Sequence, residues 1–328
     1  MNDGTTKYWG ENDIGDKLNN FSNINHSYIG VDNKQNDIIG IDLEGNQVNM
    51  NLWECTLLDN NTYILLSEAS LKAKNDKLWT NIVTGYKGDF DSVGKIEGNL
   101  PSYISIDNGL TYTTVTSISE VFRYCSDLKV SPELPNTVVD ISDAFNSTGI
   151  IEAPIIPSGV TNMGSTFQNC TLMEKASKIP IGVINLQGTF MNTKITQTPE
   201  IPYGVENMYG TFQSTLITEG PVIPNSVIDM RTTFSDCDRL VTGSDIPESV
   251  TNIEYVYANC TNLRGKITLN CNNLRGYERC FYNVAMEDDK SLVLKCNEYV
   301  YNLFFDESRT NKINSKVCQS VANIVLEK

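Results

Sequence analysis

Histidine is almost absent from this sequence, since His26 is the only one among 328 residues. Catalytic triads and Cys–His pairs need a histidine base, and catalytic zinc sites use two or three imidazoles. His26 stands in the polar run 23–27, which is typical of a solvated surface residue. We therefore expect no metal, no cofactor and no catalytic activity.

Basic charge and long apolar runs are also scarce. There are 25 Lys and Arg against 40 Asp and Glu, and the net charge is -15. Such a charge repels nucleic-acid phosphates and anionic lipid surfaces. No stretch reaches the roughly 18 uninterrupted apolar residues of a membrane span, and the first residues lack a signal-peptide core. We expect no nucleic-acid or membrane partner and synthesis in the cytoplasm without a signal peptide.

The nine cysteines form no CxxC pair. An odd number argues against a complete disulfide framework, and the missing pairs argue against a four-thiolate zinc site. Whether short disulfides form stays open. The nine are Cys55, Cys125, Cys170, Cys237, Cys260, Cys271, Cys280, Cys296 and Cys318.

A repeat runs through the middle of the chain. IPSGVTNMGSTFQNCTLM, from Ile156, and IPNSVIDMRTTFSDCDRL, from Ile223, share the template I-P-x-x-V-x-x-M-x-x-T-F-x-x-(C/T). Its prolines are 22 or 23 residues apart, at Pro135, Pro157, Pro180, Pro202, Pro224 and Pro247. Its aromatic residues are Phe122, Phe145, Phe167, Phe190, Phe212, Phe234 and Tyr257, with Phe281 a candidate eighth.

One repeat cannot bury its own apolar residues, so the units must stack and their aromatic residues must form a continuous spine. Apolar spacings of 3, 4 and 3 suit either a short helical or 3₁₀ segment or a tight solenoid corner. Each proline marks a turn, and the stretch before it, as in Ile217–Ile223, is the expected strand.

A column of small residues stands three positions after each aromatic residue. Threonines stand between the cysteines of this column, so only Cys237 and Cys260 are in adjacent coils. This spacing argues against a row of thiols that binds metal ions or forms disulfides. We expect small buried groups, with each threonine hydroxyl bonded to a backbone carbonyl. The column is Cys125, Thr148, Cys170, Thr193, Thr215, Cys237 and Cys260.

The repeats resemble the atypical leucine-rich repeats of the BspA-like kind, which run approximately as A-F-x-x-C-x-x-L followed by I-P-x-x-V-x-x-I. The match is carried by TFQNCTLM with IPSGVTNM and by TFSDCDRL with IPESVTNI, and it covers Val115–Leu274. Similar short repeats are common in Gram-positive bacteria and in the tail proteins of their phages. The resemblance implies a right-handed solenoid used as a rigid display surface. The chain departs from the family where Thr replaces the cysteine and where Gly, Glu or Thr fill strand positions that usually hold β-branched apolar residues, so we expect a short and irregular sheet.

We predict a mainly β protein with short helical or 3₁₀ turns, built as a leucine-rich-repeat-type solenoid of about seven to eight coils. Residues 1–100 form a small mainly β attachment domain, with β runs at 28–31, 37–43, 62–66 and 77–83. The solenoid covers residues 101–274. Residues 275–328 form a C-terminal capping segment, and we expect Ser315–Lys328 to close it as a helix.

Other motifs point more weakly to chemistry. Gly88–Ile96 has the wrong glycine spacing for a P-loop, and Asp89, Asp91 and Glu97 do not fit a calcium loop. Residues 287–289 are acidic and typical of a solvated turn. Glu200 and Glu219 could face each other as hydrolase carboxylates, although 40 acidic residues make such pairs by chance.

Variable columns between the repeats indicate solvent-facing positions. One lies three residues before the aromatic residue and another follows the proline. Tyr and Arg, which are enriched at recognition hot spots, gather there in the later coils, although a merely solvated face is the alternative. The candidate binding residues are Tyr203, Tyr209, Arg231, Glu254, Tyr255 and Gln187.

The expected function is non-enzymatic recognition. The favoured reading is a receptor-binding component of a phage tail fibre or baseplate, or of a phage-tail-like bacteriocin, because such a virion protein leaves by lysis and needs no export signal. Its partners are a bacterial surface protein or polysaccharide and, through residues 1–100, other tail subunits, in multiple copies. A BspA-like cell-surface adhesin is the alternative, followed by a scaffold or capsid-associated protein.

Overall fold

The computed structural model describes residues 116–285, 292–309, 312–318 and 324–328 in full and, before residue 116, the backbone of strands β1–β8. The predictions for the side chains of His26 and Cys55, for residues 77–83 and 88–97 and for the acidic cluster 287–289 lie outside the described residues.

The early strands pair antiparallel. One sheet has the order β1 (Thr6–Tyr8), β2 (His26–Asp32), β3 (Ile38–Asp42) and β4 (Gln47–Asn49). Two further pairs join β5 (Glu54–Leu57) to β6 (Tyr63–Leu66) and β7 (Tyr103–Ser105) to β8 (Tyr112–Thr114). The expected β runs 28–31, 37–43 and 62–66 overlap β2, β3 and β6, while the domain boundaries at residues 100 and 274 stay a prediction.

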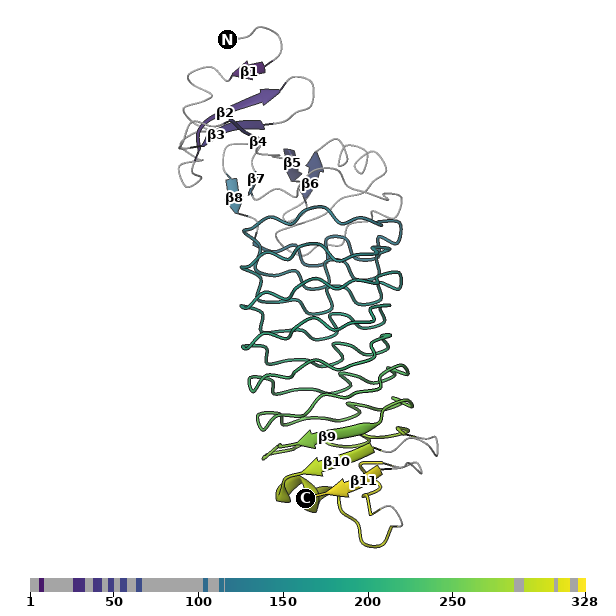
Figure 1. The fold of residues 1–328 in the computed structure, drawn as a ribbon. Helices are drawn as coiled ribbons and strands as arrows, with labels where there is room; N and C mark the ends of the chain where they lie inside the picture. The colour runs from purple at the N-terminus through teal and green to yellow at the C-terminus, as the bar shows by residue number, and fades with distance from the viewer. Residues whose placement is uncertain are drawn as a thin grey trace.

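From residue 116 the chain winds into stacked coils, which are drawn from teal to green in Figure 1. Parallel bridges join each coil to the next at one equivalent position. The predicted mainly β solenoid is thereby confirmed as the fold class. The bridged residues are Ser117, Asp140, Asn162, Asn185, Asn207, Asp229, Asn252 and Gly276.

The corner that carries the aromatic residue is a series of tight turns and not a helix. The amide of Phe167 donates to the carbonyl of Thr189 in the next coil at 3.0 Å, and the amide of Cys170 donates back to Phe167 at 3.1 Å. Ser165 and Asn169, on either side of Phe167, have left-handed φ values of 54° and 61°. Of the two alternatives left by the apolar spacing, the structure has the solenoid corner.

Each repeat proline begins a second corner. The carbonyl of Pro157 accepts a hydrogen bond from the amide of Val160 at 3.1 Å, which closes a four-residue turn. The same bond joins Pro202 to Val205 at 3.4 Å. The residue after the proline, such as Tyr203, therefore lies at the tip of the turn.

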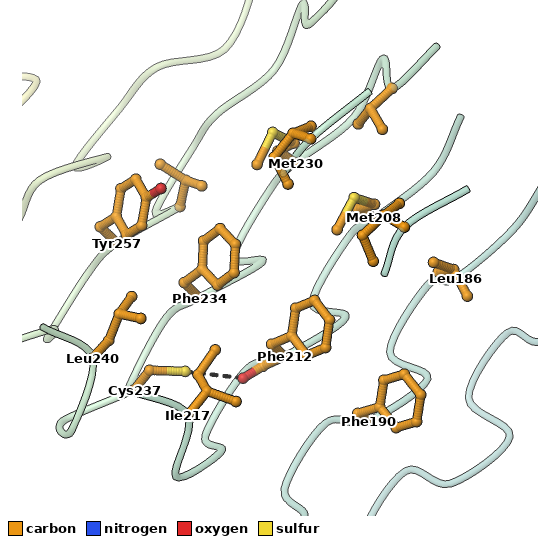
Figure 2. Packing of buried hydrophobic residues seen from close by; sticks show 14 of the residues in the cluster. Leu186, Phe190, Met208, Phe212, Ile217, Met230, Phe234, Cys237, Leu240 and Tyr257 are labelled. Atoms are coloured by element: carbon orange, nitrogen blue, oxygen red, sulfur yellow. Dashed lines mark hydrogen bonds between the residues drawn. The ribbon is translucent and has the colours of Figure 1, made fainter. Parts of the chain in front are cut away.

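The buried aromatic rings form one continuous stack along the solenoid (Figure 2). Neighbouring ring centroids are 5.1 to 5.9 Å apart, and the ring planes lie within 24° of each other. Each ring is shielded from water by the rings above and below it, so stability depends on neighbouring coils. The stack contains Phe122, Phe145, Phe167, Phe190, Phe212, Phe234, Tyr257 and Phe281.

The Cys/Thr column is buried and bonded to carbonyls. Thr193 Oγ1 donates to its own coil at the carbonyl of Phe190, at 2.8 Å, whereas Cys237 Sγ donates to the preceding coil at Phe212, at 3.0 Å. Burial raises the pKa of Cys237 to about 11. The eight cysteines with described side chains are thiols.

The predicted strand at Ile217–Ile223 is wrong. The structure has one isolated bridge there, from Glu219 to Thr242, with the amide of Gly220 donating to the carbonyl of Thr242 at 2.8 Å. Pro221 has no amide hydrogen to donate, so the ladder stops.

Three parallel strands extend the stack at its C-terminal end (Figure 1). They are β9 (Gly265–Leu269), β10 (Leu292–Cys296) and β11 (Ile324–Glu327). The closing helix expected within Ser315–Lys328 is wrong for residues 324–327, because this β-branched and apolar segment pairs with β10.

A short helix, α3 (Glu298–Phe304), follows β10. Its N-cap is Asn297, whose Oδ1 accepts the amide of Val300 at 2.9 Å. Phe304, at the end of the helix, meets Phe281 edge-on, with ring centroids 6.4 Å apart and an interplanar angle of 72°. This helix therefore covers the last ring of the stack. None of the helices in the described part has the length and apolarity to traverse a lipid bilayer.

Candidate recognition surface

A ladder of Asn and Asp side chains, which we call the Asx ladder, follows the bridged positions of the coils. In each coil Oδ1 accepts the amide two residues later, as Asn207 does from Tyr209 at 3.0 Å. Such a bond fixes the backbone where it leaves the bridge. The ladder residues and their bonds are Asp140, Asn162, Asn185, Asn207, Asp229 and Asn252.

The Asx ladder also links coils through side chains. Asn162 Nδ2 donates to Asp140 Oδ1, and Asn185 Nδ2 donates to Asn162 Oδ1, both at 2.9 Å. Farther along, Asn207 Nδ2 donates to Gln187 Oε1 at 3.4 Å. None of the predictions above includes this ladder, although the sequence carries a signal for it: the Asn or Asp that directly precedes the repeat methionine or its substitute.

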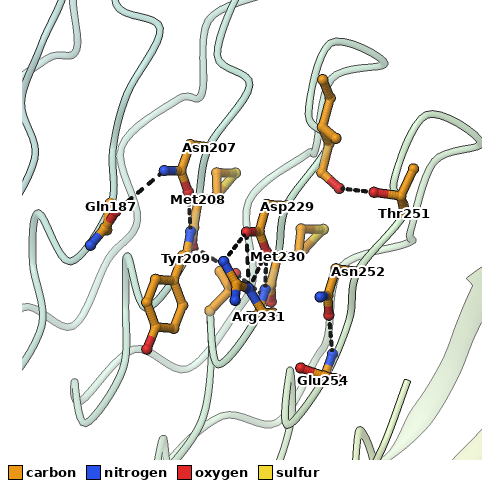
Figure 3. A network of polar contacts seen from close by, with 12 residues as sticks. Gln187, Asn207, Met208, Tyr209, Asp229, Met230, Arg231, Thr251, Asn252 and Glu254 are labelled. Atoms are coloured by element: carbon orange, nitrogen blue, oxygen red, sulfur yellow. Dashed lines mark hydrogen bonds and ion pairs between the residues drawn. The ribbon is translucent and has the colours of Figure 1, made fainter. Parts of the chain in front are cut away.

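The variable column beside the Asx ladder holds four of the candidate binding residues, which we call the central column: Gln187, Tyr209, Arg231 and Glu254. Figure 3 shows these residues in consecutive coils. Gln187 is exposed, Tyr209 is 37% exposed, and Arg231 and Glu254 are half-buried. The column therefore presents its polar and aromatic groups to solvent.

Tyr209 and Arg231 contact each other across neighbouring coils. The guanidinium carbon of Arg231 lies 4.8 Å from the centroid of the Tyr209 ring, within the range of a cation–π interaction. The pair forms a flat surface with an aromatic ring and a cationic group (Figure 3).

Asp229 holds Arg231 in this position. Arg231 Nη2 donates to Asp229 Oδ2 at 2.7 Å, and Nε donates to both carboxylate oxygens, at 3.0 and 3.1 Å. The hydrogen bonds to Asp229 raise the pKa of Arg231, and the charge of Glu254 adds to the effect. The guanidinium is therefore always charged and has little rotational freedom.

Tyr255 forms a second aromatic and cationic contact in a later coil. Arg279 Nη1 donates to Tyr255 Oη at 3.3 Å, and its guanidinium carbon is 5.8 Å from the ring centroid. The same guanidinium carbon lies 5.9 Å from the ring of Tyr282. Arg279 and Tyr282 were not among the candidates, because no template position singled them out.

Tyr203 lies apart from the central column, at the tip of a proline turn. Its side chain is 75% exposed. Within residues 116–285, which the structure describes without a gap, no hydrogen bond or ring contact joins Tyr203 to Tyr209 or Arg231. The structure therefore brings Tyr209 and Arg231 together and leaves Tyr203 separate.

The described residues hold no group of three or more His, Cys, Asp or Glu side chains that could bind a metal ion. The chemistry of the central column is that of reversible contact: hydrogen bonds from amides and a guanidinium, and an exposed aromatic face.

Two solved structures are similar to the chain at low identity. A leucine-rich repeat protein from Bacteroides ovatus ATCC 8483 is 17% identical, with a TM-score of 0.38, over 74% of this chain and 75% of that chain. A leucine rich cell surface protein from Faecalibacterium prausnitzii A2-165 is 15% identical, with a TM-score of 0.25, over 83% and 94% of the two chains. Among curated proteins, none matches the chain.

The family comparison is stronger. The model of the BspA type leucine rich repeat region matches residues 99–215 and 187–311, with six copies. Together these matches span well over half of the 328 residues. They include every ring of the aromatic stack and the whole central column. The chain therefore belongs to the family of BspA type leucine-rich repeat proteins.

Proposed function

We propose that this chain is a non-enzymatic recognition protein whose solenoid binds a ligand on the bacterial cell surface through the central column. The observation that carries the proposal is the contact of Arg231 with the exposed ring of Tyr209. Tyr and Arg dominate recognition hot spots, and here the two are held together before any ligand arrives.

The arrangement favours binding because little side-chain freedom remains to be lost. Asp229 fixes the guanidinium of Arg231, and the amide of Tyr209 is bonded to Asn207 at 3.0 Å. A pre-organised surface loses less entropy on association than a flexible one. The stacked coils repeat similar groups along one line, so a particle with several copies would bind by avidity.

The biological setting has two candidates. The first is a phage tail fibre, a baseplate or a phage-tail-like bacteriocin, in which residues 1–100 would attach to other tail subunits. The second is a cell-surface adhesin, which fits the family to which the chain belongs. In both settings the solenoid meets a bacterial protein or polysaccharide.

Binding is tested with the labelled full-length chain on a panel of intact bacteria and isolated envelopes. Changing Tyr203, Tyr209 and Arg231 together to Ala should abolish binding while the melting temperature stays within a degree or two, as expected for surface changes. The matched control is Tyr124→Ala, because Tyr124 is 50% exposed and has Arg123 5.1 Å from its ring centroid, but lies in the first coil. Unchanged binding by the triple variant would exclude this surface.

The setting is tested by locating the chain with antibodies. Particles purified from lysates should contain it if it is a tail protein, and walls of growing cells should contain it if it is an adhesin.

Incubation of the chain with isolated envelopes should release no soluble sugar or peptide, and such release would contradict the non-enzymatic assignment.

A further inference from the structure

One coil lacks the backbone hydrogen bonds that its neighbours make on the face before the proline turn. On one side the amide of Ala153 donates to Lys175 at 3.1 Å, and on the other the amide of Gly220 donates to Thr242 at 2.8 Å. Between them, within the continuously described residues 116–285, the backbone of residues 196–200 makes no such bond to either neighbouring coil. In this segment Thr196, Gln197 and Glu200 are exposed, and residues 198 and 199 are half-buried.

An open depression of about 600 Å³, which we call the coil groove, lies beside this segment. Its walls are residues 174–178 and 196–200. A second depression, of about 480 Å³, adjoins it at residues 176–178 and has Ile155 and Ile181 in its lining. These two isoleucines are 91% and 80% exposed, so an apolar pocket opens next to a polar groove.

A side chain on the wall that the two depressions share, Ser177, also lacks a hydrogen-bond partner. Its Oγ is buried. The equivalent Ser244, three coils on, donates to the carbonyl of Pro221 at 2.6 Å. An unsatisfied hydroxyl is unfavourable, so Ser177 leaves this wall less well bonded than Ser244 leaves the equivalent wall three coils on.

The lining of the coil groove favours neither anionic nor cationic ligands. Glu174 and Glu200 balance Lys175 and Lys178 in its lining. Recognition there must rest on uncharged hydrogen-bonding groups and on the apolar pocket. The backbone of an extended peptide supplies alternating donors and acceptors, and its side chains point alternately to opposite sides.

We propose that the coil groove binds an extended peptide as an added β-strand, with main-chain hydrogen bonds to residues 196–200 and an apolar side chain in the pocket of Ile155 and Ile181. Rows of unpaired backbone donors and acceptors, such as those at sheet edges, are templates for such strand addition. The site is separate from the central column, so it stands whether or not that column binds a cell-surface ligand.

The test begins with a phage-displayed library of linear dodecapeptides, panned on the full-length protein and counter-selected on Ile181→Glu. Enriched peptides should slow amide exchange at residues 196–198 and 200. Their binding to Ile181→Glu should fall about tenfold or more, and binding to Val222→Glu should not change. Val222 is the matched control because it is 89% exposed and lines neither depression.

N-methylation of the enriched peptide then tests the main-chain contact. Methylating every second amide in one register should weaken binding about tenfold or more, and the other register should be tolerated, because alternate amides face the host strand. Equal tolerance of both registers would overturn the proposal. So would a panning that yields no peptide sensitive to Ile181→Glu, provided that the variant melts like the wild type.

Discussion

Thr148 and Cys170 stand at equivalent positions in neighbouring coils and donate to the same acceptor, the carbonyl oxygen of Phe145, at 2.9 Å each. Their own Oγ1 and Sγ atoms lie 3.3 Å apart. Thr215 and Cys237 repeat the arrangement three coils further on. The amide of Thr148 donates to the same oxygen at 3.1 Å, so three donors from two coils converge on one carbonyl.

Substituting within this column should therefore have a small effect. We expect Cys170→Thr to lower the free energy of unfolding by no more than about 1 kcal/mol, because a threonine there donates within its own coil. Cys170→Leu should cost about 1 to 3 kcal/mol, because the buried site has no room for a larger side chain. Urea unfolding of both variants measures the difference, and equal losses would contradict it.

The buried thiols should also make stability depend on alkaline pH. Burial raises the pKa of Cys170 from 9.0 to about 11, so its stabilisation is complete below pH 9 and is lost as the pH rises toward 11. Between these values each such thiol should lower the free energy of unfolding by up to about 1.4 kcal/mol per pH unit. Cys170→Thr should decline less steeply than the wild type, and parallel curves would refute this role.

The aromatic stack should respond strongly to loss of one ring. Phe190→Ala should lower the free energy of unfolding by about 3 to 5 kcal/mol, because Phe190 packs between Phe167 and Phe212, at 5.9 and 5.7 Å. Tyr203→Ala, at an exposed turn tip, should change it by less than about 0.5 kcal/mol. Thermal melts of the two variants compare a buried with an exposed aromatic residue, and similar values would be inconsistent with the stacked core.

Thr232 is a site where a smaller residue should stabilise the protein. It is β-branched at a left-handed φ of 49°, and its buried hydroxyl has no hydrogen-bond partner. Glycine occupies the equivalent position in two earlier coils, at Gly188 and Gly210. Thr232→Gly should therefore raise the free energy of unfolding by about 1 kcal/mol.

The adjacent threonine supplies the control for that change. Thr233 Oγ1 lies 2.8 Å from the carbonyl oxygens of both Met208 and Met230, and its one hydrogen is shared between these two acceptors. Thr233→Gly should lower the melting temperature, whereas Thr232→Gly should raise it. If both substitutions lower it, backbone strain at Thr232 is not limiting.

Asp229 links the Asx ladder to the central column, and Asp229→Asn separates the two roles. Asparagine keeps the Oδ1 acceptor, so the free energy of unfolding should change by less than about 1 kcal/mol, but the ion pair that fixes Arg231 is lost. Binding to envelopes should weaken about threefold to tenfold. Asp140→Asn is the control, since Ser142 takes the place of the arginine there, and it should bind like the wild type.

The solenoid could be predicted because the side chains that stack in it recur at equivalent positions of the sequence repeat. Phe167 and Phe190 recur at a fixed spacing, and stacking is the way for such residues to leave water. The central column could be proposed because variation between coils marks exposed positions. The contact between Tyr209 and Arg231 could not be predicted, because the two residues are 22 positions apart in the sequence and only the stacking of the coils brings them together.

The coil groove and the C-terminal strand are less apparent from the amino-acid sequence. The coil groove arises from hydrogen bonds that residues 196–200 do not make, and Pro199 is no signal for it, because Pro154 and Pro221 hold the same position in coils that make such bonds. The helix predicted for the C-terminal segment is wrong because its strand, Ile324–Glu327, is stabilised by a partner, β10, that lies about 30 residues away.

Equivalent residues of neighbouring coils contact each other, and this also affects how a gene for such a protein can change in length. Duplication of one complete coil reproduces the stack, the Asx ladder and both corners, because every coil touches only the coils before and after it. An insertion of half a coil would place proline turns beside aromatic corners. Chains of this design can therefore lengthen or shorten their display surface in whole repeats, while the residues on that surface diversify independently of the core.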